Sequence, residues 1–312
     1  MISVRGLTKD YGKVRAVEDL SFDVPDGVVT GFLGPNGAGK STTLRMIVGL
    51  DRPTAGTATI NGHPYGSIKK PLHQVGVLLD AKAVHPNRSA AAHLKWVAQS
   101  NGIGVNRVEE VLGLVGLSDV AGRKVGGFSL GMGQRLGLAT AMLGDPHTLI
   151  LDEPVNGLDP EGIVWVRNFL KALAAEGRTI FVSSHLLSEM AQTAQNLVVI
   201  GRGRLVADTT VEEFTRSSGG SEVVVRVDPE HVEAMRQVVA QENLGGGEST
   251  DAHGRTVFSF PGQTTDMIGA VCYSYGVMVV ELTEHSASLE EAFMQSTGES
   301  RQFTAGTVTQ EH

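Results

Sequence analysis

Residues 28–41 read Val-Val-Thr-Gly-Phe-Leu-Gly-Pro-Asn-Gly-Ala-Gly-Lys-Ser, an apolar run that leads directly into a glycine-rich segment. The run 28–33 predicts a buried strand, and apolar residues at helical spacing from Leu44 to Leu50 predict a helix after the glycines. Gly34 to Ser41 fits the pattern G-x-x-x-x-G-K-S, in which glycines let successive N–H groups face an anion. This order predicts a phosphate-binding loop in an α/β fold, with the helix N-terminus aimed at the phosphate.

The loop defines the expected nucleotide site. We expect Lys40 to bridge the β- and γ-phosphates of ATP and to stabilise charge during catalysis, and the Ser41 hydroxyl to bind Mg²⁺. The residues expected to bind ATP in this segment are Gly34, Pro35, Asn36, Gly37, Ala38, Gly39, Lys40, Ser41 and Thr42.

Two carboxylates follow another apolar run, at 149–151, which predicts a strand that ends at Asp152 and Glu153. Ligands of open parallel sheets bind at the carboxyl ends of the strands, so these side chains are expected beside the phosphates. Asp152 is suited to hold Mg²⁺, and Glu153 to accept a proton from an attacking water. His185 follows the next buried strand along the chain, and we expect it to contact the γ-phosphate.

Strands that alternate with helices predict a parallel core sheet with crossover helices, preceded by antiparallel strands near the N-terminus. After residue 215 the pattern changes to a short linker and a small α+β domain. The expected organisation is a nucleotide-binding domain at 1–215 with a helical subdomain at about 85–145, a linker at 216–221, an α+β domain at 222–298 with a loop at 243–255, and a disordered tail at 299–312.

The composition narrows the class of protein. At 312 residues one large or two unequal domains are expected, and 41% hydrophobic residues exclude a wholly disordered chain. A net charge of −8 argues against a surface built for nucleic acid. The single cysteine, Cys272, excludes an internal disulfide and a thiolate metal cluster, which fits a reducing cytosol. No apolar run is long enough to span a membrane, and the N-terminus lacks the apolar core of a signal peptide.

A second motif, Phe-Ser-Leu-Gly-Met-Gly-Gln-Arg at 128–135, lies upstream of the carboxylates. It resembles the signature motif of ATP-binding cassette (ABC) ATPases, usually written LSGGQ. Ser129 and Gly131 match its serine and second glycine, whereas Leu130 and Met132 depart from it. The resemblance implies that Ser129 and Gly131 cover the ATP held by a second copy of the chain. Two copies then enclose two ATP molecules head to tail as a homodimer.

Other positions match the same family one by one. Tyr11 matches the aromatic residue that stacks on adenine, Asp159 belongs to a matching D-loop at 156–159, and His185 matches the switch histidine. Asp80 stands where the family has the Q-loop glutamine. A carboxylate there can accept a hydrogen bond from metal-bound water but cannot donate one, so Asp80 is assigned as a metal contact. The C-terminal domain, which ends in the segment 281–299, is similar to an appendage on cassettes that pair with ABC-2-type permeases in drug export.

The resemblance implies an ATP-hydrolysing subunit of an ABC exporter that uses ATP and Mg²⁺. It would energise separate integral membrane permease subunits, export a drug, antibiotic or other hydrophobic compound, and lie in the cytoplasm on the inner face of the cell membrane. No nucleic acid partner is expected. One alternative is a soluble non-transport ABC ATPase that acts on the ribosome or nucleic acid; such proteins generally carry two cassettes or additional insertions. A small-molecule kinase with the same loop would not need the Ser129 motif.

Overall fold

The computed structural model divides the chain into two compact units, of which Met1–Val211 forms most of the first and Glu212–Ser296 the second. It describes residues 1–81, 83–217, 221–251, 253–286 and 288–297. The sequence placed the domain boundary at 215; the first unit ends at Val211, and the helix α7 (Val211–Ser217) covers the start of the expected linker. Linker residues 218–220 and the expected tail at 299–312 lie outside the described residues.

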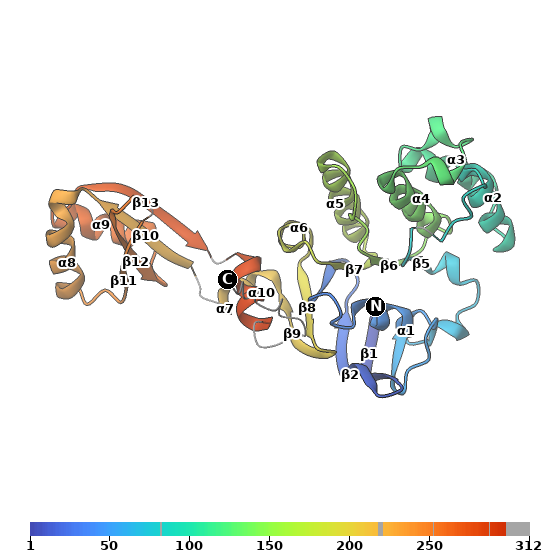
Figure 1. Ribbon diagram of the computed structural model, residues 1–312, viewed down its shortest axis with the longest axis horizontal. Coiled ribbons are helices and arrows are strands. Elements are labelled where there is room, and N and C mark those ends of the chain that lie inside the picture. Colours follow the sequence, from blue (N-terminus) through green and yellow to red (C-terminus); the bar gives the residue numbers. More distant parts are fainter. Residues whose placement is uncertain (82, 218–220, 252, 287, 298–312) are drawn as a thin grey trace, which may run out of the picture. The chain divides into compact units, whose positions relative to one another are not determined.

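A six-stranded sheet forms the centre of the first unit (Figure 1). Its order is β5-β6-β7-β3-β8-β9; the first five strands pair in parallel and β9 is antiparallel. Every residue of β3 and of β7 is buried, as the continuous apolar runs predict for a parallel sheet covered on both faces. The strand bounds are β3 (Val29–Leu33), β5 (Val75–Leu78), β6 (Thr148–Asp152), β7 (Thr179–Ser184), β8 (Asn196–Gly201) and β9 (Arg204–Thr210).

A separate antiparallel sheet packs against this centre. It has the order β2-β1-β4, with β1 (Ile2–Tyr11), β2 (Val14–Val24) and β4 (Ala55–Ile60). Three aromatic rings join the two sheets: Phe22 of β2 lies 5.8 Å from Phe32 of β3 and 5.7 Å from Phe181 of β7, between ring centroids. Because all three rings are buried, this cluster fixes how the antiparallel sheet sits beside the strand that precedes the glycine loop.

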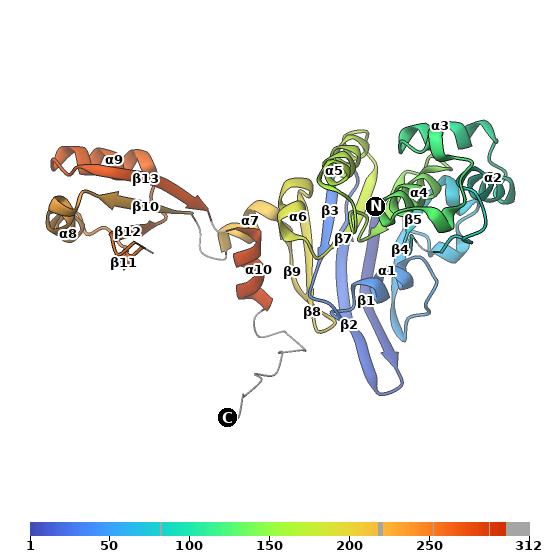
Figure 2. The same cartoon turned by 45° about the horizontal axis from the view of Figure 1, so that its top comes forward.

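Three helices of the first unit begin at residues whose side chains cap them. The Ser89 side chain caps α2, Ser129 caps α4, and Asp159 followed by Pro160 caps α5. Figure 2 shows α2, α3 and α4 gathered in one helical region, which falls within the segment where the sequence predicted a helical subdomain. The helix bounds are α1 (Lys40–Ile47), α2 (Ala90–Ser100), α3 (Asn106–Leu114), α4 (Leu130–Met142), α5 (Pro160–Ala175) and α6 (Leu187–Thr193).

The second unit has a four-stranded antiparallel sheet in the order β11-β12-β10-β13. Its chain order, strand-helix-strand-strand-helix-strand, is that of a ferredoxin-like fold. Alternate residues of β10 (Val223, Val225 and Val227) pack with Met235 and Ile268 of the two helices. The elements are β10 (Ser221–Val227), α8 (Val232–Gln241), β11 (Gly247–Thr250), β12 (Thr256–Pro261), α9 (Thr265–Ser274) and β13 (Val279–Ser286), followed by α10 (Leu289–Thr297).

One expectation about this unit is wrong. The segment 243–255 was predicted to be a loop, but it contains the edge strand β11, which pairs with β12 from Gly247 opposite Ser259 to Thr250 opposite Thr256. All four residues of β11 are exposed, so the strand carries no apolar alternation that would have marked it. Its formation depends on the neighbouring strand.

Candidate nucleotide site

The glycine loop between β3 and α1 has a backbone that requires glycine at two positions. Gly39 caps α1 with φ of 105°, and a Cβ there would lie 2.7 Å from the Ala16 carbonyl oxygen. A Cβ on Gly34 would lie 2.6 Å from the Ile200 carbonyl oxygen. The loop therefore passes too close to neighbouring backbone for any side chain, which leaves its N–H groups accessible from the other side.

A cavity of about 270 Å³ opens over this loop. Loop residues form one side, and the two carboxylates at the end of β6 form the other. The lining residues are Ala16, Pro35, Asn36, Gly37, Ala38, Gly39, Lys40, Ser41, Thr42, Asp152 and Glu153. The structure thus brings together the predicted phosphate loop, except Gly34, and the predicted carboxylates, although more than a hundred residues separate them in the sequence.

Lys40, the first residue of α1, is only 7% exposed. Its Nζ donates a hydrogen bond to the Gly34 carbonyl oxygen at 2.6 Å, so the side chain folds back over the loop. Burial lowers the pKa of this amine, while Glu153 and Asp152 oppose the shift. The partners of this desolvated ammonium group are the backbone carbonyl oxygens of Gly34 and Pro35.

Asp152 ends β6, and a serine of the neighbouring strand holds its side chain. The Ser183 hydroxyl donates to Asp152 Oδ1. The same hydroxyl accepts a hydrogen bond from the Glu153 backbone N–H at 3.0 Å. Ser183 is fully buried, so one hydroxyl on β7 orients both carboxylate-bearing residues at the end of β6.

Glu153 leaves the strand with φ of +51°, a left-handed conformation that is costly for a residue with a side chain. Hydrogen bonds hold it there from two sides. Its N–H is bound by Ser183, and its carbonyl oxygen accepts a bond of 3.4 Å from Gln134 Nε2 of α4.

His185 follows β7, and its Nδ1 lies 2.6 Å from Glu153 Oε2. Since a carboxylate can only accept, the bonded tautomer carries its proton on Nδ1. The His185 backbone N–H also points to Glu153 Oε2 at 3.3 Å. The predicted base and the predicted γ-phosphate contact are therefore in direct contact, with side-chain exposures of 22% for Glu153 and 46% for His185.

The signature segment and the segment 156–159 contact each other. A Cβ on Gly157 would lie 2.1 Å from Leu130 Cδ2, and one on Gly131 would lie 3.2 Å from Leu158 Cδ2. Ser129 Oγ accepts from the Met132 N–H and caps its own helix, and Asp159 caps α5 in the same way. These residues lie outside the lining of the loop cavity of the same chain.

Tyr11 and Asp80 also lie outside that lining. The Tyr11 hydroxyl donates to Asp51 Oδ2 at 2.9 Å, and Lys9 Nζ lies 4.9 Å from the ring centroid. The ring is 48% exposed and so retains accessible surface. Asp80 is exposed just beyond β5.

Sequence reasoning did not identify Ser183 or Gln134 as site residues. Ser183 lies two positions before His185 on the strand that pairs with β6, and strand pairing was the signal that could have found it. Gln134 lies in the second motif, but its contact with Glu153 depends on how α4 packs against the sheet, where it lies on β5, and no local pattern shows this.

Comparison with known proteins places this site in a family. A family model described as "ABC transporter" matches residues 17–156. The bacitracin transport ATP-binding protein BcrA of Bacillus licheniformis is 36% identical over 311 residues, which cover 96% of this chain and 97% of that protein. The chain belongs to the ATP-binding subunits of ABC transporters. It is an ATPase of this family, as the sequence predicted, and such subunits work with membrane components.

Solved structures of this family share the fold of the first unit. An ATP-binding subunit of an ABC transporter matches with a TM-score of 0.64 at 28% identity, over 70% of this chain and 92% of that one. The dimeric cassette MJ0796 bound to ADP and Pi matches with a TM-score of 0.62 at 23% identity, over 68% of this chain and 99% of that one. The expected cassette fold is confirmed. Among the described residues of the ABC subunit, no helix is long and apolar enough to cross a membrane.

Proposed function

We propose that this chain is the ATPase subunit of an exporter for antibiotic-like compounds, driven by head-to-tail dimerisation around ATP. The observation that carries the proposal is the cavity bounded by the phosphate loop on one side and by Asp152 and Glu153 on the other. The exporter assignment is supported by the near full-length similarity to a bacitracin transport protein.

The residues present fit a magnesium ion. Mg²⁺ in nucleotide sites takes one or two carboxylates and keeps phosphates and waters as its other ligands. The described residues hold no cluster of three or more His, Cys, Asp or Glu side chains, whereas Ser41 and Asp152 line the same cavity. In this proposal Ser41 and Asp152 would hold the ion, and Asp80 would accept a hydrogen bond from a water bound to it. When bound, the ion neutralises phosphate charge.

The chain's own residues divide the work of hydrolysis. Lys40 exchanges its bond with the Gly34 carbonyl for phosphate oxygens and stabilises the developing charge. Glu153 accepts a proton from the attacking water at its carboxylate. His185 donates from Nδ1 to Glu153 Oε2 and so orients that carboxylate. A second proton, on Nε2, lets the ring donate to the γ-phosphate as well.

The position of the signature residues supports the proposed dimer. Ser129, Gly131 and Asp159 are outside the lining of the cavity in their own chain, which supports a role at the ATP of a second copy. The N-terminus of α4 offers backbone N–H groups and a partial positive charge for that phosphate. A dimeric solved cassette with the same fold agrees with this arrangement.

In this proposal the adenine base of ATP stacks on the ring of Tyr11. The chain lies on the inner face of the cell membrane, where it binds separate permease subunits. Closure of the dimer on ATP would move the permease, and hydrolysis would reopen it. We propose no nucleic acid partner, because the chain carries a net charge of −8.

The test is the Glu153→Gln variant, which keeps the size of the side chain and an acceptor for His185 but removes the base. ATP turnover is expected to fall about 10²–10⁴-fold, and light scattering with Mg²⁺ and ATP should show a stable dimer in the presence of the permease. Glu109→Gln, on the exposed face of α3, is the matched control. Turnover near the wild-type rate in Glu153→Gln would show that Glu153 is not the base.

A further inference from the structure

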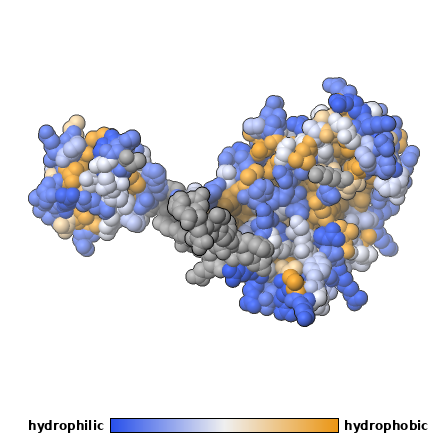
Figure 3. Space-filling model, in the orientation of Figure 1, coloured by the Kyte–Doolittle hydropathy of each residue, from blue (hydrophilic) through white to orange (hydrophobic). Residues whose placement is uncertain are grey.

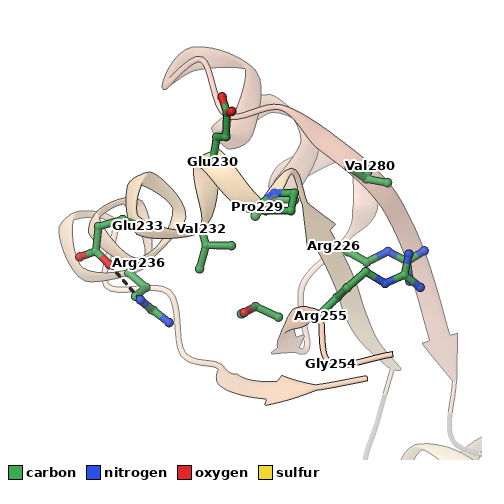
Figure 4. Close-up of a pocket in the computed structure, with 11 residues that line it drawn as sticks. Arg226, Pro229, Glu230, Val232, Glu233, Arg236, Gly254, Arg255 and Val280 are labelled. Atoms are coloured by element: carbon green, nitrogen blue, oxygen red, sulfur yellow. Dashed lines mark hydrogen bonds and ion pairs between the residues drawn. The ribbon is translucent and has the colours of Figure 1, made fainter. Parts of the chain in front are cut away.

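The second unit has a cavity of about 530 Å³ that the nucleotide site does not use (Figure 4). It opens where the end of β10, the start of α8 and the turn before β12 come together. Sites for small organic molecules have volumes of about 300–1,000 Å³. This cavity therefore has the size of a small-molecule site within a single folded unit.

One part of the cavity lining is apolar. Val227 is buried at the end of β10, and Pro229 and Val232 follow it into α8. Val280 adds a fourth apolar side chain from β13. The pairing of β10 with β13 shifts between Arg226 opposite Glu281 and Val227 opposite Val279, so that Val280 is an extra residue in a bulge. The bulge leaves Val280 55% exposed at the cavity.

The other part is formed by arginines from different elements. Figure 4 shows the side chains of Arg226 and Arg255 converging on one side of the cavity. Both donate to the same oxygen, Asp251 Oδ2, at 3.2 Å from Arg226 Nη1 and 2.9 Å from Arg255 Nε. Arg226 Nη2 also donates to Glu281. Asp251 thus holds two guanidinium groups side by side.

These arginines keep unused donors. Arg255 Nη1 and Nη2 donate to none of the residues that the structure describes, and Arg226 Nε is buried without a hydrogen-bond partner among them. The third arginine at the cavity, Arg236, differs because it donates three bonds to Glu233 and Glu248. The open fork on Arg255 is the geometry that binds a carboxylate through two parallel hydrogen bonds.

The charges at the cavity decide the class of anion. The three arginines carry three positive charges, and four carboxylates contact them, namely Glu233, Glu248, Asp251 and Glu281. A phosphate monoester would add two negative charges to this set, whereas a carboxylate adds only one and can pair with the open fork of Arg255. The carboxylate of Glu230, which also lines the cavity, points away from it in Figure 4.

We propose that this cavity binds a small organic carboxylate with an apolar body. Its carboxylate pairs with the open fork of Arg255, and its apolar body lies against Val232 and Val280. The second unit is then a ligand-binding domain attached to the ATPase, a function separate from the nucleotide site.

The test uses the full chain and the probes octanoate and N-acetyl-leucine in calorimetric titrations up to about 10 mM. Arg255→Ala removes the fork, and Arg255→Lys keeps the charge without it. Val280→Trp fills the cavity without changing a charge. Arg123→Ala, an exposed arginine of the first unit, is the control. Octanol and octyl phosphate test the need for a single negative charge.

We expect saturable binding of the carboxylate probes that Arg255→Ala weakens about tenfold or more, that Arg255→Lys weakens nearly as much, and that Val280→Trp abolishes. Binding should persist in Arg123→Ala and in the presence of saturating ATP. Absence of saturable binding of both probes to the wild-type chain overturns the proposal. The proposal is also overturned if Arg255→Ala and Val280→Trp bind the carboxylate probes as tightly as the wild-type chain does. Tighter binding of octyl phosphate than of octanoate, or competition between ATP and the carboxylate probes, would overturn it as well.

Discussion

Ser183→Ala is expected to slow ATP hydrolysis while leaving the protein folded. The Ser183 hydroxyl donates to Asp152 Oδ1 and accepts from the Glu153 N–H. The variant therefore removes one hydrogen bond to the Asp152 side chain and one to the Glu153 backbone. The perturbation therefore tests whether their orientation, apart from their charge, matters to catalysis.

The cost to stability follows from what remains after truncation. The Glu153 N–H keeps an acceptor, the Ser183 carbonyl oxygen at 3.2 Å, and the partly exposed Asp152 carboxylate can bind water instead. We therefore expect a loss of about 1 kcal/mol in the free energy of unfolding, at the low end of the range for buried polar partners. The effect on turnover should be larger, about 10–100-fold, as for other groups that orient metal ligands.

The assay is ATP turnover at saturating ATP and Mg²⁺, alongside denaturant unfolding. Thr148→Val is the control, because Thr148 is a fully buried residue of the same strand as Asp152 and its hydroxyl has no hydrogen-bond partner among the described residues. That variant should keep both turnover and stability. If Ser183→Ala turns over ATP within about twofold of wild type while its stability drops as expected, the orienting role is refuted.

Two further predictions concern the helical region and the glycine loop. His93 is buried on α2, and burial, with a contribution from Arg88, lowers its pKa from 6.5. As the pH falls below 6.5, the unfolded chain binds this proton before the folded chain does, so the free energy of unfolding should decrease with falling pH. The decrease should be less steep in His93→Gln. Denaturant titrations at several pH values measure it, and the same dependence of unfolding free energy on pH in both proteins would contradict the prediction. Gly39→Ala should destabilise the protein by about 1–3 kcal/mol and abolish ATP binding, because the new Cβ would meet backbone atoms. The control is Gly62→Ala, which is also at positive φ but has open space around it. It should lower the free energy of unfolding less, as measured by thermal unfolding, and keep ATP binding.

The surface adds little information about partners. The face of the molecule in Figure 3 mixes hydrophilic and hydrophobic residues over both units. The functional assignments therefore come from buried and half-buried groups, such as Lys40, Ser183 and Asp251, whose partners are fixed by packing.

The sequence by itself determined the local features of the site. Glycine at residues 34 and 39, the apolar run before them and the helical spacing after them can be read within one stretch of chain, because Cβ sterics and helix periodicity act over a few residues. The same holds for the strand that ends at Asp152. Residue patterns of this kind were sufficient to predict the fold class and most of the residues that line the cavity over the glycine loop.

Tertiary structure decided which of these features meet. Sheet order puts β6 beside β7, and only this pairing brings Ser183 to Asp152 and His185 to Glu153, across about thirty residues of sequence. The polar strand β11 and the cavity at Arg255 likewise depend on neighbours that are distant along the chain. Contacts of this kind arise from strand pairing and side-chain packing, which minimise the free energy of the whole fold and leave no periodic trace in any single segment.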